Sequence, residues 1–285
     1  MQMRTALDDF LLSYSGARSP ATVAWYRRRL GELGDFLGDV DVGRVTISDL
    51  RRFRCALESR GLAVRTRHGY VRAVRRFFAW LVEEGVLPVN VALRLELPRL
   101  PKGEVKGIRQ EDLCKMFAVA ASSPRDLALC WVFYSTGARL GGVVGLGLAD
   151  LDLEHGRARV TEKFTKSRTV YLVPRAVEAL RAWLAVRPDM PGVYSVFVGK
   201  RGKLTGSGVY QVMASIAERA GVGPGWNPHN WRHKRARDLL AAGVGLGVVS
   251  QVLGHSGVQV TADIYGLLDE AQLQNAVNGV QLAFQ

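Results

Sequence analysis

Apolar residues recur at helical spacing along the N-terminal third of the chain. The clearest stripe runs from Tyr70 to Val82, and Gly85 marks the expected end of that helix. Similar patterns begin near Leu7 and behind Ser19-Pro20. The third helix in chain order begins at Thr46-Ile47-Ser48-Asp49, which has the form of a capping box that opens a helix, so the stripe from Tyr70 to Val82 belongs to the fourth. The pattern predicts a helical domain over residues 1–92.

The pattern changes after residue 92. Residues 93–106 contain Pro98, Pro101 and Gly103 with little periodicity, which predicts a linker. From residue 107 the chain reads as mostly helical, with one hairpin of alternating residues. The expected helices cover 109–121 and 124–136, begin again at Pro174 and after Thr205, and run from Pro228 to about 268; the expected strands are Arg157–Thr161 and Thr169–Val173. An amphipathic tail follows from about residue 269. The fold class expected is therefore mainly α with a small β-sheet.

A basic stripe lies opposite the apolar face of the fourth helix. No acidic residue occurs between Arg65 and Arg76 to balance it by local pairing. Unneutralised cations at helical spacing favour contacts with nucleic-acid phosphates over a merely solvated face. The residues expected to contact DNA from this helix are Arg65, Arg67, His68, Arg72, Arg75 and Arg76.

Composition strengthens the case for a polyanionic partner. The chain has 285 residues, with 39 Lys and Arg against 26 Asp and Glu, and a net charge of +13. Both halves carry the excess, as expected of two domains that grip double-stranded DNA. There is no leader-like apolar run at the N-terminus and no membrane-length apolar stretch, which predicts a cytoplasmic protein without membrane contact. The three cysteines lack metal-ligand spacing and are expected to be buried, reduced thiols.

Candidate chemistry is carried by an ordered set of basic residues that ends in a tyrosine. The set comprises Thr136–Arg139, Lys163, Pro228–His233, His255 and Tyr265. Arginine, lysine and histidine side chains can bind and neutralise a phosphodiester, and a tyrosine hydroxyl can attack its phosphorus without a metal ion. The sequence has no phosphate-binding glycine loop of the nucleotide-hydrolase type and no acidic metal-ligand cluster. No cofactor and no metal are therefore expected.

The order and spacing of these residues resemble the tyrosine recombinase (phage integrase) family, and in particular its Xer-like site-specific recombinases. The resemblance covers nearly the whole chain. It implies an N-terminal helical core-binding (SAM-like) domain, and a mixed α/β tyrosine-recombinase catalytic domain over residues 107–285. It also implies a role for each matching residue. Tyr265 would be the nucleophile, Arg139 and Arg232 the phosphate clamps, and His255 a donor to the phosphate. Lys163 would be the general acid, and His229 would either handle the tyrosine proton or orient the tyrosine.

Some positions depart from the family pattern or leave a choice open. Lys166 is the alternative to Lys163 as general acid. The family usually has an acid three residues after the first arginine, where it helps to hold that arginine, and this chain has Gly142. Position 235 is often a buried aromatic in the family and is arginine here. Lys166, Lys234 and Arg235 are expected to contribute further DNA contacts.

The resemblance further implies the partners and the reaction. The substrate would be double-stranded DNA with a specific recombination site, and strands would be exchanged through a Holliday junction. The active form would be a homo-tetramer in the nucleoid, with the C-terminal tail docked on a neighbouring protomer. Three other readings stay open: a transposase-type member of the same family that serves a mobile element, a type IB topoisomerase-like enzyme, and a catalytically degenerate DNA-binding protein.

Overall fold

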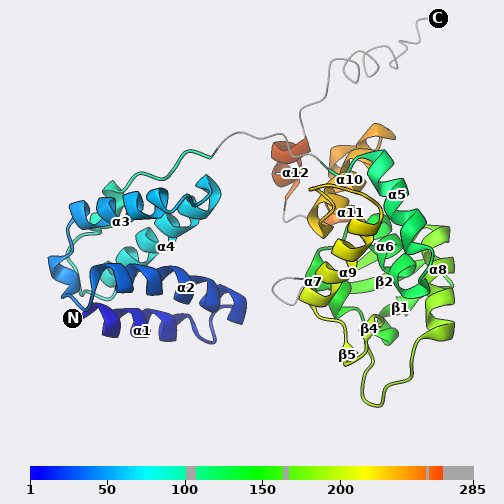
Figure 1. The fold of residues 1–285 in the computed structure, drawn as a ribbon, viewed down its shortest axis with the longest axis horizontal. Coiled ribbons are helices and arrows are strands. Elements are labelled where there is room, and N and C mark those ends of the chain that lie inside the picture. The colour runs from blue at the N-terminus through cyan, green and yellow to red at the C-terminus, as the bar shows by residue number, and fades with distance from the viewer. Residues whose placement is uncertain (101–106, 163–166, 255–256, 266–285) are drawn as a thin grey trace, which may run out of the picture. The chain divides into compact units, whose positions relative to one another are not determined.

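A computed structural model describes residues 1–100, 107–162, 167–254 and 257–265 of the chain (Figure 1). The chain divides into two compact units, Met1–Gly103 and Glu104–Gln285, and each is described by itself. The described part is mostly helical with small sheets, which confirms the fold class expected from the sequence.

The N-terminal unit consists of helices and two short 3₁₀ turns. They are α1 (Met3–Tyr14), α2 (Pro20–Leu37), η1 (Val42–Arg44), α3 (Ile47–Ser59), α4 (Val64–Glu83) and η2 (Val91–Arg94). The predicted capping box is present: the Asp49 amide donates to the Thr46 hydroxyl at 3.3 Å, and the Thr46 amide donates to the Asp49 carboxylate at 2.8 Å. Gly85, with φ of +70°, follows the end of α4 as expected.

The apolar stripe of α4 forms the centre of the N-terminal core. Phe77 and Phe78 are fully buried, and the Phe77 ring lies 5.6 Å from that of Phe10 on α1 in an edge-to-face arrangement. Ala92 and Leu95 are buried in the same core, so the chain through η2 packs with the N-terminal helices. This packing leaves the opposite, basic side of α4 at the surface.

The C-terminal unit contains more helices and two small sheets. Its elements are α5 (Gln110–Ala120), α6 (Pro124–Thr136), α7 (Leu140–Gly145), η3 (Leu148–Asp150), β1 (Leu151–Asp152), β2 (Arg157–Thr161), β3 (Ser167–Tyr171), α8 (Pro174–Val186), β4 (Val198–Gly199), β5 (Gly202–Lys203), α9 (Gly206–Arg219), α10 (Pro228–Ala241), α11 (Leu246–Leu253) and α12 (Val258–Tyr265). One sheet has the antiparallel order β1-β2-β3, and β4 pairs with β5 in the other.

The hairpin is present with a shifted second strand. β3 begins at Ser167 rather than at the expected Thr169, because Ser167 pairs with Thr161 across the ladder and their hydroxyls hydrogen-bond at 2.8 Å. The helix α7 and the strands β1, β4 and β5 were not predicted. Each of them is too short to show a hydrophobic period.

The buried helix α6 organises the C-terminal unit. It packs against α8 and α10 (Figure 1) and also against β3. The Ser135 hydroxyl, almost fully buried, donates to the Tyr171 carbonyl at 3.1 Å and accepts from the Val173 amide at 2.7 Å. This bridge fixes the C-terminal end of α6 against the sheet, so the turn that follows α6 is held firmly.

The cysteine expectation is wrong for two of the three residues. Cys130 is buried, and burial raises the pKa of its thiol, whereas Cys55 and Cys114 are exposed; all three are free thiols. Cys55 and Cys114 lie on the outward faces of α3 and α5, which their small, weakly polar side chains tolerate. Among the helices of the described ranges, none is both long and apolar enough to cross a membrane.

Candidate active site

The turn after α6 places Arg139 where the helical core meets α11. Gly137 has φ of +56°, and a Cβ added there would lie 2.7 Å from the Leu253 side chain, so both conformation and space require glycine. The Thr136 hydroxyl accepts from the Ala138 amide at 3.1 Å and shapes the turn. Arg139 then forms the N-cap of α7. This local structure explains why the Thr-Gly-x-Arg run precedes a site.

Arg139 is held by a carboxylate and by the end of α11. Its amide donates to one oxygen of Glu162 at 2.9 Å, and its guanidinium forms an ion pair with the other oxygen. The same guanidinium donates to the Gly254 carbonyl at 3.4 Å. The Arg139 side chain is still 44% exposed, so it is oriented by these contacts and open to a ligand.

The second arginine lies on α10 and is buried. Arg232 is 3% exposed, and its guanidinium donates to the Gly137 carbonyl at 2.7 Å. That carbonyl belongs to the turn that leads to Arg139, so both arginines are tied to one piece of backbone. Asn227 caps α10 by accepting from the His229 and Asn230 amides.

His229 lies one helical turn before Arg232, as its spacing predicted. Its ring centroid is 4.2 Å from that of the buried His233. Although His229 is exposed, partial desolvation and then the cations Arg232 and Arg139 lower its pKa. The imidazole is therefore neutral near pH 7 and can accept a proton.

The carboxylate of Glu162 is ionised in a strongly cationic environment. Burial opposes its ionised form, but the Arg139 amide and the guanidiniums of Arg168, Arg139 and Arg232 outweigh burial and lower the pKa of Glu162. The guanidiniums of Arg139 and Arg168 contact this carboxylate, and the charge of Arg232 acts on it without a direct contact. The cluster keeps a positive excess, which suits a bound phosphate.

The remaining catalytic candidates are only partly covered. Lys163, the alternative Lys166, and His255 lie outside the described residues. Tyr265 is the last residue of α12, which packs on α11. Among the described residues, the site therefore brings together Arg139 at the start of α7 with His229 and Arg232 on α10.

Two expected DNA contacts have partners within the protein. Lys234 forms an ion pair with Asp238, and the Tyr134 hydroxyl donates to the same carboxylate at 3.0 Å. The Arg235 guanidinium lies over the Tyr134 ring, 5.7 Å from its centroid. Arg235 thus packs on an aromatic ring of α6 where the family often has an aromatic of its own. The predicted DNA contacts of Lys234 and Arg235 stay predictions.

The basic stripe of α4 is less free than its sequence suggested. Arg67 forms an ion pair with Glu58 of α3, and Arg76 pairs with Glu83 at 2.6 Å. Arg76 also donates to the Tyr14 hydroxyl at 2.6 Å. No acid lies between Arg65 and Arg76, but the inference that these arginines are unneutralised is wrong for Arg67 and Arg76, because their carboxylate partners lie on α3 and in later turns of α4.

Of the other arginines in the stripe, one is held by backbone carbonyls and two are exposed to solvent. Arg75 donates to the Leu95 and Leu93 carbonyls at 3.0 Å each, so its guanidinium anchors η2. In the described part of the chain, the exposed Arg65 and Arg72 make no ion pair and no hydrogen bond through their side chains. These two remain available to a phosphate.

A further cation next to this surface was missed by the sequence reading. The Arg29 guanidinium lies over the Trp25 ring of α2, 4.0 Å from its centroid. A Cβ added at Gly69 of α4 would lie 3.2 Å from Arg29, so the two helices approach closely there. The spacing of Trp25 and Arg29, one turn apart on α2, was the available signal.

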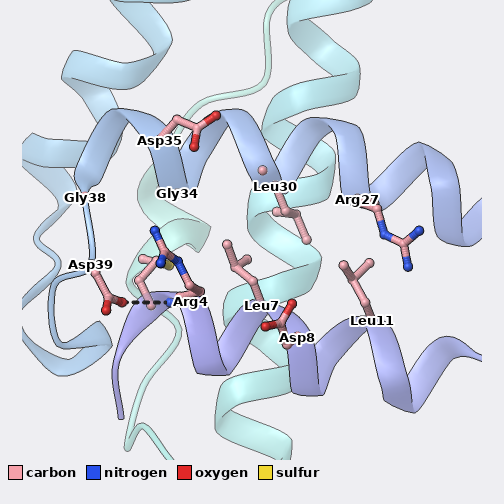
Figure 2. A pocket seen from close by; sticks show the side chains of 12 residues that line it. Arg4, Leu7, Asp8, Leu11, Arg27, Leu30, Gly34, Asp35, Gly38 and Asp39 are labelled. Atoms are coloured by element: carbon pink, nitrogen blue, oxygen red, sulfur yellow. Dashed lines mark hydrogen bonds between the residues drawn. The ribbon is translucent and has the colours of Figure 1, made fainter.

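A groove of about 440 Å³ in the N-terminal unit lies between α1 and α2 (Figure 2). Leu7, Leu11 and Leu30 line its apolar part, and the Arg4 amide donates to Asp39 at its edge at 3.1 Å. Its charged lining has more carboxylates than guanidiniums, so it does not suit a phosphate. None of the predicted catalytic residues lines it.

Glu162 and Arg168 are the site residues that sequence reasoning missed. Glu162 directly precedes Lys163, and Arg168 ends the Val-x-x-Lys-x-x-Lys-x-Arg run, so both lay within a motif already noticed. Arg168 donates to the Val252 carbonyl at 2.7 Å and lies 3.4 Å from Glu162. Within the described ranges, no cluster of His, Cys, Asp and Glu is arranged to hold a metal ion.

Comparison with known proteins identifies the class. The phage integrase family matches residues 106–271, and the N-terminal SAM-like domain of phage integrases matches residues 7–85. The chain belongs to the phage integrase family and is an enzyme that breaks and rejoins DNA strands.

Individual relatives narrow the class to site-specific recombinases. Tyrosine recombinase XerC of Chromohalobacter salexigens is 34% identical over 96% of this chain and 94% of that protein. Among solved structures, a lambda integrase tetramer bound to a Holliday junction matches with a TM-score of 0.75 and 16% identity, over 95% of this chain and 80% of that one. The Tn1549 transposon integrase bound to circular intermediate DNA matches with a TM-score of 0.81 and 14% identity, over 98% and 99%. The chain is a XerC-like site-specific recombinase with the fold of these integrases.

Proposed function

We propose that the protein cuts and rejoins DNA at a specific site through a 3′-phosphotyrosyl intermediate on Tyr265. The observation that carries the proposal is the cation cluster: Arg139 and Arg232 are tied to the same turn, oriented, and in charge excess over Glu162. A phosphate of the DNA backbone matches that excess. Phosphoryl transfer needs such preorganised donors where charge builds up in the transition state.

The chemistry balances without an external energy source. The Tyr265 oxygen attacks the scissile phosphorus, a phosphotyrosyl bond forms, and the bond to the 5′ oxygen breaks. His229, neutral because its pKa is lowered, accepts the tyrosine proton, and Lys163 donates a proton to the departing 5′ oxygen. Arg139, Arg232 and His255 stabilise the charge on the phosphate oxygens. Attack by a 5′-hydroxyl on the phosphotyrosine then reverses the sequence and rejoins a strand.

The assembly belongs to the same proposal. The active form is a homo-tetramer on two DNA sites that exchanges strands through a Holliday junction, and residues after Tyr265 dock on a neighbouring protomer. The lambda integrase tetramer on a Holliday junction, which shares the fold, supports the proposal. The tail itself, residues 266–285, lies outside the described residues. DNA in the cytoplasmic nucleoid is the proposed setting.

The test uses a nicked duplex that carries the sequence enriched by this protein from a random duplex library. Cleavage beside the nick releases a short 5′-ended fragment and traps the intermediate. A complex that survives SDS, and forms equally in excess EDTA, is the expected result. A gel shift without a covalent complex would instead identify a degenerate DNA-binding protein. Relaxation of supercoiled plasmid by a monomer, with no product joined between two sites, would favour the topoisomerase alternative.

A further inference from the structure

The carboxylate that holds Arg139 comes from an unexpected place in the chain. Family resemblance places an acid at position 142, three residues after Arg139, yet this chain has Gly142 there. Glu162, at the end of β2, contacts Arg139 with both carboxylate oxygens, one on the amide and one on the guanidinium. The Glu162 side chain is 7% exposed, so the carboxylate is shielded from solvent while the Arg139 side chain stays open to a ligand.

Gly142 and Glu162 are neighbours in space. A Cβ added at the buried Gly142 would lie 3.3 Å from Cγ of Glu162 and 3.5 Å from Cβ of Val160. That contact with Glu162 is tighter than side chains usually make. A side chain at 142 and the side chain of Glu162 would therefore compete for one space, and glycine at 142 leaves room for the glutamate.

We propose that Glu162 is the positioning carboxylate of the active site and takes the place of the acid missing at position 142. The proposal rests on the proposed function, because it assigns Glu162 a role through Arg139 in DNA cleavage. Glu162 does not touch the substrate in this role. Its negative charge would repel a phosphate, so its benefit comes from the orientation that it gives the arginine.

The same carboxylate links the hairpin to α11. Arg168 contacts Glu162 at 3.4 Å and donates to the Val252 carbonyl, while Arg139 donates to the Gly254 carbonyl. Glu162 is thus the acidic centre of an arginine pair that grips the C-terminal end of α11. In the sequence, His255 follows Gly254 and Lys163 follows Glu162, so two further candidate catalytic residues are chain neighbours of residues in this cluster.

The first measurement is the single-turnover rate of covalent-complex formation on the nicked duplex. Glu162→Gln keeps the shape of the side chain and one acceptor for the Arg139 amide, but it removes the charge that orients the guanidinium. We expect the rate to fall by about 10- to 100-fold, as for other residues that orient a functional side chain without touching the ligand. DNA affinity should be nearly unchanged. A parallel drop in affinity and rate would mean a DNA contact instead and would overturn the proposal.

The second measurement returns the acid to position 142. Glu162→Gly should be as slow as Glu162→Gln, and Gly142→Glu alone should be slow because two carboxylates crowd one space. The double variant Gly142→Glu with Glu162→Gly should form the complex at least about tenfold faster than Glu162→Gly alone, since residues in contact do not act additively. Gly141→Glu combined with Glu162→Gly is the matched control. An added Cβ at Gly141 meets no atom within 4 Å, so this acid adds the same charge without reaching the vacated space.

The outcomes separate this proposal from the proposed function. Failure of the wild-type protein to form a covalent complex would overturn both. If the wild-type protein forms the complex and Glu162→Gln forms it at the same rate, only the role of Glu162 is overturned. Equal recovery by the Gly141 control would also overturn it, because charge and not position would then suffice. Circular dichroism and thermal melts check that each variant is folded, and if the exchanged variant is not, the rate of Glu162→Gln decides.

Discussion

The two units of this recombinase use their arginines in contrasting ways. On α4 of the N-terminal unit, Arg67 and Arg76 form partly exposed ion pairs with carboxylates of their own domain, which cancels much of their charge. In the C-terminal unit, the Arg232 guanidinium donates to a backbone carbonyl, and Arg139 and Arg168 share the carboxylate of Glu162. Backbone carbonyls orient a cation without neutralising it. The arginines of the C-terminal unit should therefore set the rate of cleavage. The exposed arginines of α4 should affect only the affinity for DNA.

The largest expected effect falls on the C-terminal unit at the leaving group. Lys163→Ala should slow cleavage of a normal site by about 10²- to 10⁴-fold, the usual worth of a general acid. A substrate with a 5′ thiolate leaving group needs no proton and should recover much of that rate. Single-turnover cleavage of the two substrates measures this. Rescue seen for Lys166→Ala and not for Lys163→Ala would move the role to Lys166.

The next effect separates rate from affinity at Arg139. Replacing Arg139 with Ala should slow covalent-complex formation by about 10²- to 10³-fold, as expected for one lost donor to transition-state charge. Thermal stability should change little, because the side chain is half exposed and Glu162 retains Arg168. Arg159→Ala on β2 removes an equal charge from an exposed arginine and is the control. Equal rate losses for both variants would show that only net charge matters.

The pH dependence of the rate tests the environment of His229. The free imidazole titrates near about pH 6.5, and the folded site lowers that pKa. A lowered pKa keeps the imidazole in its neutral, proton-accepting form to a lower pH, so the midpoint of the fall in rate should lie below the pH at which a free imidazole titrates. This fall in rate at low pH, the acid limb of the profile, should disappear in His229→Gln. It should be retained in His155→Gln, which replaces an exposed histidine in the turn between β1 and β2. An acid limb with its midpoint at or above 6.5 would contradict the assignment.

The smallest effect concerns the exposed part of the α4 stripe. Neutralising Arg65 and Arg72 together, both to Gln, should weaken DNA binding and flatten its salt dependence by about two units of slope, roughly 0.9 for each phosphate contact. The rate within the bound complex should not change. Arg67 and Arg76, both to Gln, form the matched control with the same change in charge, and their slope should change less because each already has a carboxylate partner. Identical slopes for the two double variants would mean that the ion pairs of Arg67 and Arg76 do not reduce their contribution to DNA binding.

Most of the fold could be predicted from local features of the sequence. Periodicity and capping chemistry predicted the long helices from α1 to α10, because both depend on residues a few positions apart. The short α7 and the strands β1, β4 and β5 could not be predicted, because contacts with distant segments, such as β1 with β2, define them. The third strand was misplaced at its start for the same reason, since its register is set across the hairpin.

In the candidate site too, local features could be predicted from the sequence and contacts between distant segments could not. The spacing of His229 and Arg232 on one helix was readable, and so was the glycine turn before Arg139. The glutamate that pairs with Arg139 lies twenty-three positions away in sequence, and the ion pairs of Arg67 and Arg76 reach beyond the nearest helical turn. A pattern on one helix shows which charges it carries, and the fold decides which of them are already paired.

The proposed reaction depends above all on Tyr265 being the nucleophile. Its most direct test is mass spectrometry of the complex trapped on the nicked duplex, after digestion with nuclease and protease. We expect a peptide that contains Tyr265 with a 3′-linked nucleotide, and no adduct with Tyr265→Phe, whose DNA affinity should match the wild type. An adduct on any other residue, or a covalent complex that persists in Tyr265→Phe, would contradict it.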